Sequence, residues 1–141
     1  AYAITPSLSM QLAASHAKHT YSYDQVLSGI NINDNLIDTA PRNIANLQLL
    51  WQANDMTRVG LELHTTSSYF TDPENQHSYQ GHSLVNLRAA WQLTANLSVT
   101  ARINNLTDER YAERADYTTF SGDRYFPGRP RNAMLSASYQ F

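Results

Sequence analysis

Apolar and polar residues alternate along most of this chain, with an apolar side chain at every second position. Six stretches carry the pattern: residues 7–15, 45–52, 58–66, 85–93, 97–104 and 132–141. A period of two residues is typical of a β-strand with one apolar and one polar face, and helical spacing is nearly absent. The one clear exception is Leu50, which falls on the polar side of its stretch. The pattern therefore predicts six strands.

The connections between these stretches alternate between short and long. Residues 54–56 and 94–96 are tight turns, whereas residues 24–40, 70–81 and 108–129 are long, polar and rich in Gly, Asp, Asn, Tyr and Pro. An up-and-down sheet with short turns at one end and long loops at the other is typical of transmembrane barrels. We predict an all-β fold: an antiparallel up-and-down meander of about six strands that is part of a larger transmembrane β-barrel.

A soluble β-sandwich or a lipocalin-like barrel would show the same alternation, so the aromatic residues are used to separate the alternatives. Trp51, Trp91 and Tyr139 fall near the short turns, and Tyr69 and Tyr111 fall near the long loops, all in the apolar parity. Two aromatic girdles around an aliphatic band match the two interfaces of a bilayer. Tyr21 lies at a similar distance from the short turns, but its position in the alternation places it on the polar face. Either a bulge intervenes or the residue belongs to a loop.

Composition excludes several classes of protein. The net charge is −2, and Lys18 is the sole lysine among ten basic residues, so no basic stripe for nucleic acid exists. Cysteine is absent, which excludes disulfides and thiolate metal sites. No nucleophile-base pair, phosphate loop or carboxylate pair appears, so we predict no catalytic residues, no cofactor and no enzyme activity. His77 and His82 flank a loop segment, but their spacing matches no metal site, and none is predicted.

The last third of the chain carries three motifs. Residues 105–111 read NLTDERY, residues 125–131 read YFPGRPR, and the chain ends in YQF. They resemble the NL-x-D-x-x-Y segment and the following region of TonB-dependent outer-membrane receptors. Residues 40–43 and 85–88 are weaker echoes of the same region. The resemblance covers nearly the whole chain.

The resemblance implies that residues 1–141 are the C-terminal segment of a receptor barrel, with the plug domain and the remaining strands absent. It implies binding and TonB-dependent uptake of a ferric siderophore or a similar scarce ligand at the outer membrane of a Gram-negative bacterium. The alternative is a structural or adhesive outer-membrane barrel without active transport. The implied partners are the lipid bilayer and lipopolysaccharide, the rest of the barrel and the plug, the TonB system, and the barrel-assembly machinery, which would read Phe141.

Two sets of polar and aromatic residues are candidates for function. Loop residues that could bind an anionic, partly aromatic chelate are Tyr21, Tyr23, Arg114, Tyr117, Phe120, Arg124, Tyr125 and Phe126. The alternative is that these tyrosines extend the outer girdle. Counting from the short turns places Glu62, Arg88 and Arg102 at one height on the polar face. We expect them to form a charge ladder that faces the barrel lumen and the plug; the alternative is an ordinary water-lined wall.

Overall fold

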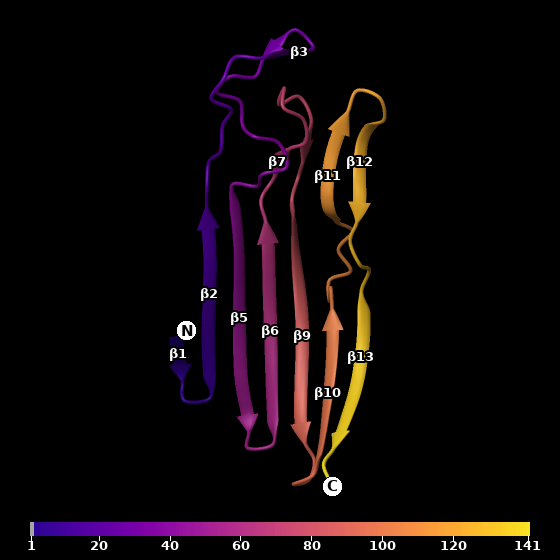
Figure 1. Cartoon of the computed structure of the whole chain (residues 1–141). Helices are drawn as coiled ribbons and strands as arrows, with labels where there is room; N and C mark the ends of the chain where they lie inside the picture. The colour runs from indigo at the N-terminus through magenta and orange to yellow at the C-terminus, as the bar shows by residue number, and fades with distance from the viewer. Residues whose placement is uncertain (1) are drawn as a thin grey trace.

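The computed structural model describes residues 2–141, and its main element is a sheet of seven antiparallel strands (Figure 1). The strands follow chain order: β1 (Tyr2–Thr5), β2 (Leu8–His16), β5 (Asn43–Asn54), β6 (Thr57–Thr66), β9 (His82–Gln92), β10 (Leu97–Asn104) and β13 (Asn132–Tyr139). The predicted up-and-down meander is confirmed, with seven strands in place of six. The described residues contain no helix that is long and apolar enough to cross a membrane.

The additional strand is β1, which pairs with β2 so that Tyr2 faces Met10. The connecting turn is held by Thr5, whose hydroxyl accepts a hydrogen bond from the Leu8 amide at 3.0 Å. A strand of four residues contains only two full alternations, Tyr2 and Ile4 against Ala3 and Thr5. That is too short for the periodicity to distinguish it from a loop.

The register brings the apolar side chains of neighbouring strands into rows. Leu61 of β6 faces Leu87 of β9, which in turn faces Ile103 of β10. Cross-strand pairs of this kind stabilise a sheet, but they leave the outer surface of each side chain uncovered. Leu135, in the next strand, keeps 73% of its surface exposed. The apolar face is continuous and has no packed layer over it within the described residues.

Leu50, the exception to the alternation, has a local explanation. It faces Gly60 across β5 and β6 on the polar side of the sheet. A Cβ atom added to Gly60 would lie 3.2 Å from Leu50 Cδ2. Leu50 therefore covers the space that the missing glycine side chain leaves open.

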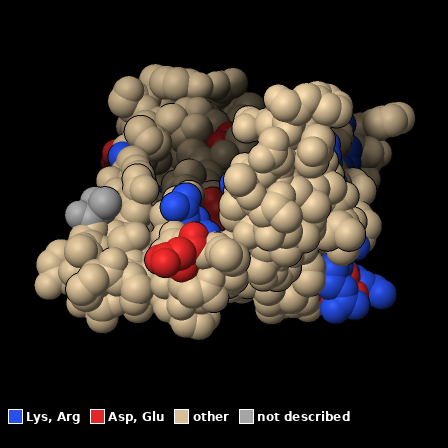
Figure 2. All heavy atoms as spheres, turned by 90° about the horizontal axis from the view of Figure 1, so that it is seen from below, with Lys and Arg blue, Asp and Glu red and all other residues tan. Residues whose placement is uncertain are grey.

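The two ends of the sheet differ, as the connection lengths predict. One end, here the turn end, carries the short turns, and Figure 2 shows it largely free of charged side chains, which form a few small groups. The other, the loop end, carries three hairpins: β3 (Val26–Leu27) with β4 (Ile30–Asn31), β7 (Tyr69–Phe70) with β8 (Ser78–Tyr79), and β11 (Ala112–Thr118) with β12 (Gly122–Pro127) (Figure 1).

The three long loops are joined to one another. The Asn75 side chain accepts a hydrogen bond from the Leu36 amide at 2.8 Å and donates one to the Leu36 carbonyl at 2.9 Å. The Tyr117 amide donates to the Thr71 carbonyl at 2.9 Å. These bonds tie residues 17–42, 67–81 and 105–131 into one ordered unit, which we call the loop assembly.

Candidate functional site

The segment of residues 105–111 turns the chain out of β10. Asn105 and Asp108 both have positive φ angles, of 52° and 56°. Asparagine and aspartate tolerate this left-handed conformation better than most residues. The Asn105 side chain, which is only 3% exposed, bonds both the amide and the carbonyl of Glu109 at 2.8 Å. Asp108 instead accepts a bond from the Arg131 amide at 3.3 Å, next to the start of β13.

Two parts of the sequence motif meet directly. The Tyr111 ring lies over Gly128, where an added Cβ would come within 2.1 Å of the ring. Tyr111 also approaches His82, with ring centroids 4.7 Å apart. The Gly128 amide also donates to the Tyr111 carbonyl at 2.9 Å. A glycine is therefore required at position 128 because any side chain would displace Tyr111.

A hollow of about 780 Å³ lies where the polar face meets the loop assembly, and we call it the upper hollow. Residues of β6 and β9, among them His64 and His82, form its wall, and loop residues, among them Tyr69, Tyr79, Tyr111 and Arg114, form its rim. The Tyr79 hydroxyl accepts a hydrogen bond from the Ala112 amide at 3.0 Å and lies 3.1 Å from His82 Nδ1. This arrangement suits a neutral His82 whose Nδ1 accepts a hydrogen bond from the Tyr79 hydroxyl.

The predicted outer girdle is wrong for Tyr69 and Tyr111, because both line the upper hollow on the polar side. Each strand leaves the sheet before it reaches its tyrosine: β6 ends at Thr66, and β10 ends at Asn104. The Tyr69 hydroxyl instead accepts a bond from the Ala115 amide at 2.9 Å, and burial raises the pKa of Tyr69.

The other three girdle residues lie on the apolar face near the turn end. Trp51 faces Val59, Trp91 faces Val99, and Tyr139 faces Leu97. Phe141 follows β13 and packs its ring edge-on against Tyr139, with centroids 5.4 Å apart. Contact of these residues with a bilayer stays a prediction.

The loop candidates fall into two groups. Tyr21 and Tyr23 belong to residues 17–42 and meet edge to face, with centroids 5.8 Å apart. The Tyr21 hydroxyl donates to Asp38 at 2.5 Å, and burial, together with this bond, raises the pKa of Tyr21. Its hydroxyl is thus already engaged within the loop. The other six candidates lie on the β11–β12 hairpin, toward the opposite side of the loop end in Figure 1.

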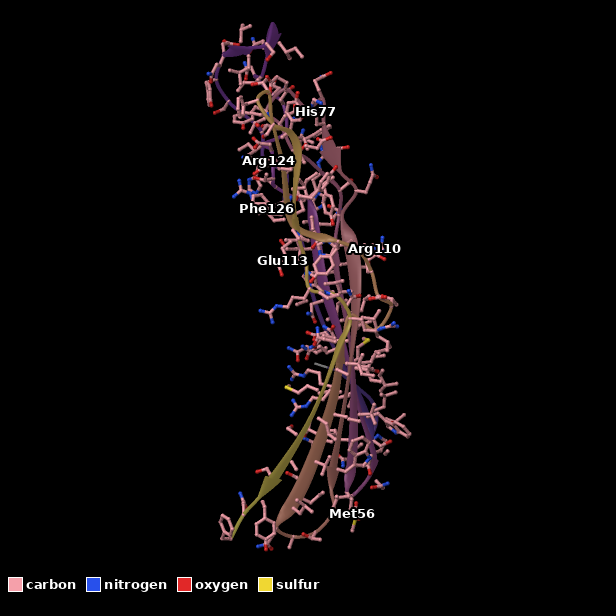
Figure 3. The ribbon with its side chains drawn as sticks, turned by 90° about the vertical axis from the view of Figure 1, so that its right-hand side faces the viewer. Met56, His77, Arg110, Glu113, Arg124 and Phe126 are labelled. Carbon is pink, nitrogen blue, oxygen red and sulfur yellow. The ribbon has the colours of Figure 1, made fainter. Side chains whose placement is uncertain are left out.

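The two hairpin arginines share one carboxylate. Arg114 and Arg124 bind the buried Asp116 at 2.7 and 2.6 Å, and the hydrogen bond from Arg124 holds the pKa of Asp116 below its usual range. Arg114 also lies over the Phe126 ring, 5.4 Å from its centroid. The arginine side chains remain 63% and 44% exposed, so one net positive charge is accessible. Figure 3 shows Arg124, Phe126 and Glu113 on one side of the ribbon and Arg110 on the other.

The remaining hairpin aromatics differ in their surroundings. Tyr117 stacks on His77, with centroids 3.6 Å apart and planes within 9°. Phe120 is at the hairpin tip and is 99% exposed. Tyr125 approaches Tyr79, at 6.4 Å between centroids. Within residues 2–141, no group of three or more His, Cys, Asp or Glu side chains is arranged to hold a metal ion.

The predicted charge ladder is wrong in its pairing. Glu62 faces Asn86, and its carboxylate accepts hydrogen bonds from the amides of Asn46 at 3.1 Å, Gln48 at 3.3 Å and Asn86 at 3.4 Å. We call these three side chains the amide cage. No ion pair between Glu62 and an arginine occurs in the described part of the chain. The carboxylate is satisfied by neutral donors.

The error lies in the register between β6 and β9. The Gln92 amide bonds the Met56 carbonyl at 2.8 Å, so β9 ends at Gln92, two residues before the position from which the heights were counted. Arg88 therefore faces Gly60 rather than Glu62, although all share the polar face. The alignment of Arg88 with Arg102 is confirmed, because the two face each other across β9 and β10.

Sequence reasoning did not select the amide cage or the histidines of the upper hollow. A signal was present for both: Asn46, Gln48 and Asn86 have the parity of Glu62, and His64 and His82 have the parity of the polar face. Parity alone does not distinguish a solvated side chain from one that binds its neighbour across a strand.

The comparison with known families agrees with this geometry. Residues 4–106 match the family described as "TonB dependent receptor-like, beta-barrel". The chain belongs to this family. The match spans strands β2, β5, β6, β9 and β10 of the wall.

Solved receptors share the fold. The siderophore receptor PiuA from Acinetobacter baumannii is 19% identical over 96% of this chain, with a TM-score of 0.78. The ferric-catecholate import receptor Fiu from Escherichia coli K12 is 22% identical over 98%, and the ferric yersiniabactin uptake receptor FyuA from Yersinia pestis is 16% identical over 99%, each with a TM-score of 0.78. This chain covers 20%, 19% and 22% of those three chains. It thus spans about a fifth of their length.

Proposed function

We propose that this chain forms the C-terminal strands of an outer-membrane receptor of a Gram-negative bacterium, and that the receptor imports a ferric siderophore or a chemically similar chelate. In this proposal the apolar face contacts lipid, with lipopolysaccharide in the outer leaflet, and the polar face lines the barrel lumen. The free edges of β1 and β13 pair with the remaining strands, a plug domain occupies the lumen, and the TonB system supplies the energy. No covalent chemistry is involved.

The observation that carries the proposal is the placement of the upper hollow. It lies on the polar face directly under an ordered loop assembly, with three tyrosines and Arg114 at its rim. Aromatic faces and an accessible guanidinium suit a ligand that is anionic and partly aromatic. The volume of about 780 Å³ falls in the range of small-molecule sites. Together with family membership, this favours uptake over a purely structural or adhesive barrel.

The candidate ligand residues are ranked by their access to the hollow. Arg114 lines it and uses one of its nitrogens to bind Asp116, which leaves other donors for a ligand. Arg124, Phe126, Tyr117, Tyr125 and Phe120 belong to the same hairpin and would add contacts above it. Tyr21 and Tyr23 lie in another loop, so they would contact only a ligand that extends across the loop end.

The test is uptake by cells that carry the full-length receptor as their sole receptor of this class. Radioactive iron is offered as catecholate, hydroxamate and citrate chelates, and binding is measured separately by quenching of a fluorophore on the loop end. We expect one chelate class to accumulate in a TonB-dependent manner. Binding without accumulation, or neither, would instead favour a structural or adhesive barrel.

The Arg114→Gln variant tests the site. Removal of the accessible charge should weaken chelate binding about tenfold, which corresponds to about 1.4 kcal/mol. Arg110→Gln is the matched control, because Arg110 does not line the upper hollow and lies on the side of the ribbon opposite to Arg124 and Phe126 (Figure 3). Equal losses in the two variants would place the ligand elsewhere.

Phe141 is proposed as the residue that the barrel-assembly machinery reads. It is fully exposed beyond the last strand, so its removal takes away little packing within the chain. Deletion of Phe141 should lower the amount of receptor at the surface far more than the chelate affinity of the molecules that do assemble. Normal surface levels after deletion would remove this role.

A further inference from the structure

The polar face has a second hollow, in the middle of β9 and β10, with a volume of about 240 Å³. We call it the lower hollow. The charged residues that line it are Glu62, Arg88 and Arg102, and the polar amides are Gln48, Asn86 and Asn104. Two positive charges and one negative charge leave a net charge of +1.

The two arginines of the lower hollow lack an acidic partner. Arg88 and Arg102 are direct cross-strand neighbours, a position in which side chains lie about 5 Å apart at Cβ and like charges repel. Neither takes part in an ion pair among residues 2–141. Glu62 does not compensate, because the amide cage holds its carboxylate. The negative charge that would balance this pair must come from outside the described strands.

The neighbouring residues supply no acidic partner. Arg88 faces Gly60 on its other side, and the side chain that covers Gly60 is the uncharged Leu50. Arg102 faces Met134 on its far side, which has no charge. Two guanidinium groups that project side by side from rigid strands present planar donor forks, which match the two oxygens of a carboxylate.

We infer that Arg88 and Arg102 form a clamp for one aspartate or glutamate side chain, carried by a polypeptide segment that lies inside the barrel. The inference rests on the proposed function only in that it needs a barrel with an interior segment. A chelate fits poorly, because a volume of about 240 Å³ is below the usual range for small-molecule sites. A single carboxylate neutralises the net charge and matches the volume.

Charge reversal in the full-length receptor tests the clamp. Arg88→Glu and Arg102→Glu are compared with Arg58→Glu, which is also on the polar face but at the turn end, where its Nε donates to Gln52 at 2.9 Å. A fluorophore on the interior segment reports the urea concentration at which that segment unfolds. We expect the two clamp variants to lower this midpoint by about 1 M relative to the control. The midpoint of Arg88→Lys should stay close to that of the unmodified receptor.

The partner is then found by a charge swap. Each acidic residue of the interior segment is replaced in turn by arginine in the Arg88→Glu background. One replacement should restore the midpoint. The clamp is overturned if the reversals lower the midpoint no more than Arg58→Glu does. It is also overturned if no swap restores the midpoint and inorganic phosphate protects both arginines from phenylglyoxal, because the site would then hold a free anion.

Folding of the variants is checked by the mobility of the unheated barrel on electrophoresis. If a reversal prevents assembly, Arg88→Met and Arg102→Met enter the same urea test, with the same expected direction. Chelate uptake by the unmodified receptor tests the proposed function separately from the clamp. Restoration by a swap without any uptake supports the clamp and contradicts the proposed function, whereas normal uptake with no effect of the reversals contradicts the clamp alone.

Discussion

Buried residues are distributed between the strands and the loops of this protein in the opposite way to most soluble domains. All four buried apolar residues of the described chain lie in the loop assembly: Ile32, Tyr79, Ala112 and Ala115. The buried polar residues, Thr71, Asp72, Asn105 and Asp116, lie there as well. The seven strands of the wall have none. In most proteins the loops are the exposed and mobile part and the strands carry the core.

The difference follows from what covers each region. The wall satisfies its backbone through the strand ladder and leaves its apolar side chains for an apolar environment outside the chain. Under the proposed function the loop assembly faces water, so it must bury its own apolar groups and pair its own polar ones. It does so through side chains that bind distant backbone, such as Tyr69 to Ala115 and Tyr79 to Ala112. The four predictions below test this contrast, from the largest effect to the smallest.

A charge on the apolar face should cost most. Leu87 lies between Leu61 and Ile103 in the middle of the wall. In a membrane, Leu87→Arg should lower the free energy of unfolding by about 2–4 kcal/mol, because an arginine near the bilayer midplane has no polar partner. Urea titration of the receptor in lipid vesicles measures this. The control, Thr100→Arg on the polar face, should cost less than about 1 kcal/mol. Equal costs would contradict the assignment of the two faces.

A side chain at position 128 should disrupt the contact between the motifs. Gly128→Ala places a methyl group inside the Tyr111 ring position and should cost about 1–3 kcal/mol by overpacking. Thermal unfolding of the receptor measures the loss. In a Tyr111→Ala background the same substitution should cost much less, because the clashing ring is gone. Additive costs in the double variant would show that the two residues do not interact.

Removal of one hydroxyl should loosen the β11–β12 hairpin. Tyr79→Phe leaves the buried Ala112 amide without its acceptor, which should cost about 1–2 kcal/mol locally. Hydrogen exchange of the Ala112 amide should speed up accordingly, while exchange in β9 and β10 stays unchanged. Tyr125→Phe is the control, because Tyr125 is mostly exposed. The same acceleration in both variants would argue against this role of Tyr79.

Acid should weaken the hairpin through Asp116. Its pKa in the folded protein is lowered, so its stabilising contribution is present above the unfolded value of about 3.9 and is lost as the pH falls through the folded value. Protease cleavage of the hairpin should therefore increase as the pH drops below about 4. Asp116→Asn should remove this dependence, and Asp123→Asn, on the other face of the hairpin, should keep it. If cleavage still depends on pH in both variants, a group other than Asp116 causes the dependence.

Most of the wall could be predicted because its signals are local. The period of two residues identified the wall strands longer than four residues, but not β11 and β12, which lie in the predicted loop of residues 108–129. Parity assigned each wall side chain to a face, as Leu61, Leu87 and Ile103 show. The motif of residues 105–111 was likewise recognisable, and the bonds of Asn105 to Glu109 are bonds between near neighbours. For these features each residue needs only its own conformation and that of the next few residues.

The candidate sites depended on contacts that no local pattern carries. A difference of two residues in where β9 ends moved Glu62 away from Arg88 and into the amide cage. The positive φ angles of Asn105 and Asp108 turned the chain so that Tyr111 reached His82 and not the apolar face. The sequence by itself thus determined six of the seven wall strands, their faces and the family. The tertiary structure decided the register and the direction of the loops, because both depend on hydrogen bonds between residues distant in the chain.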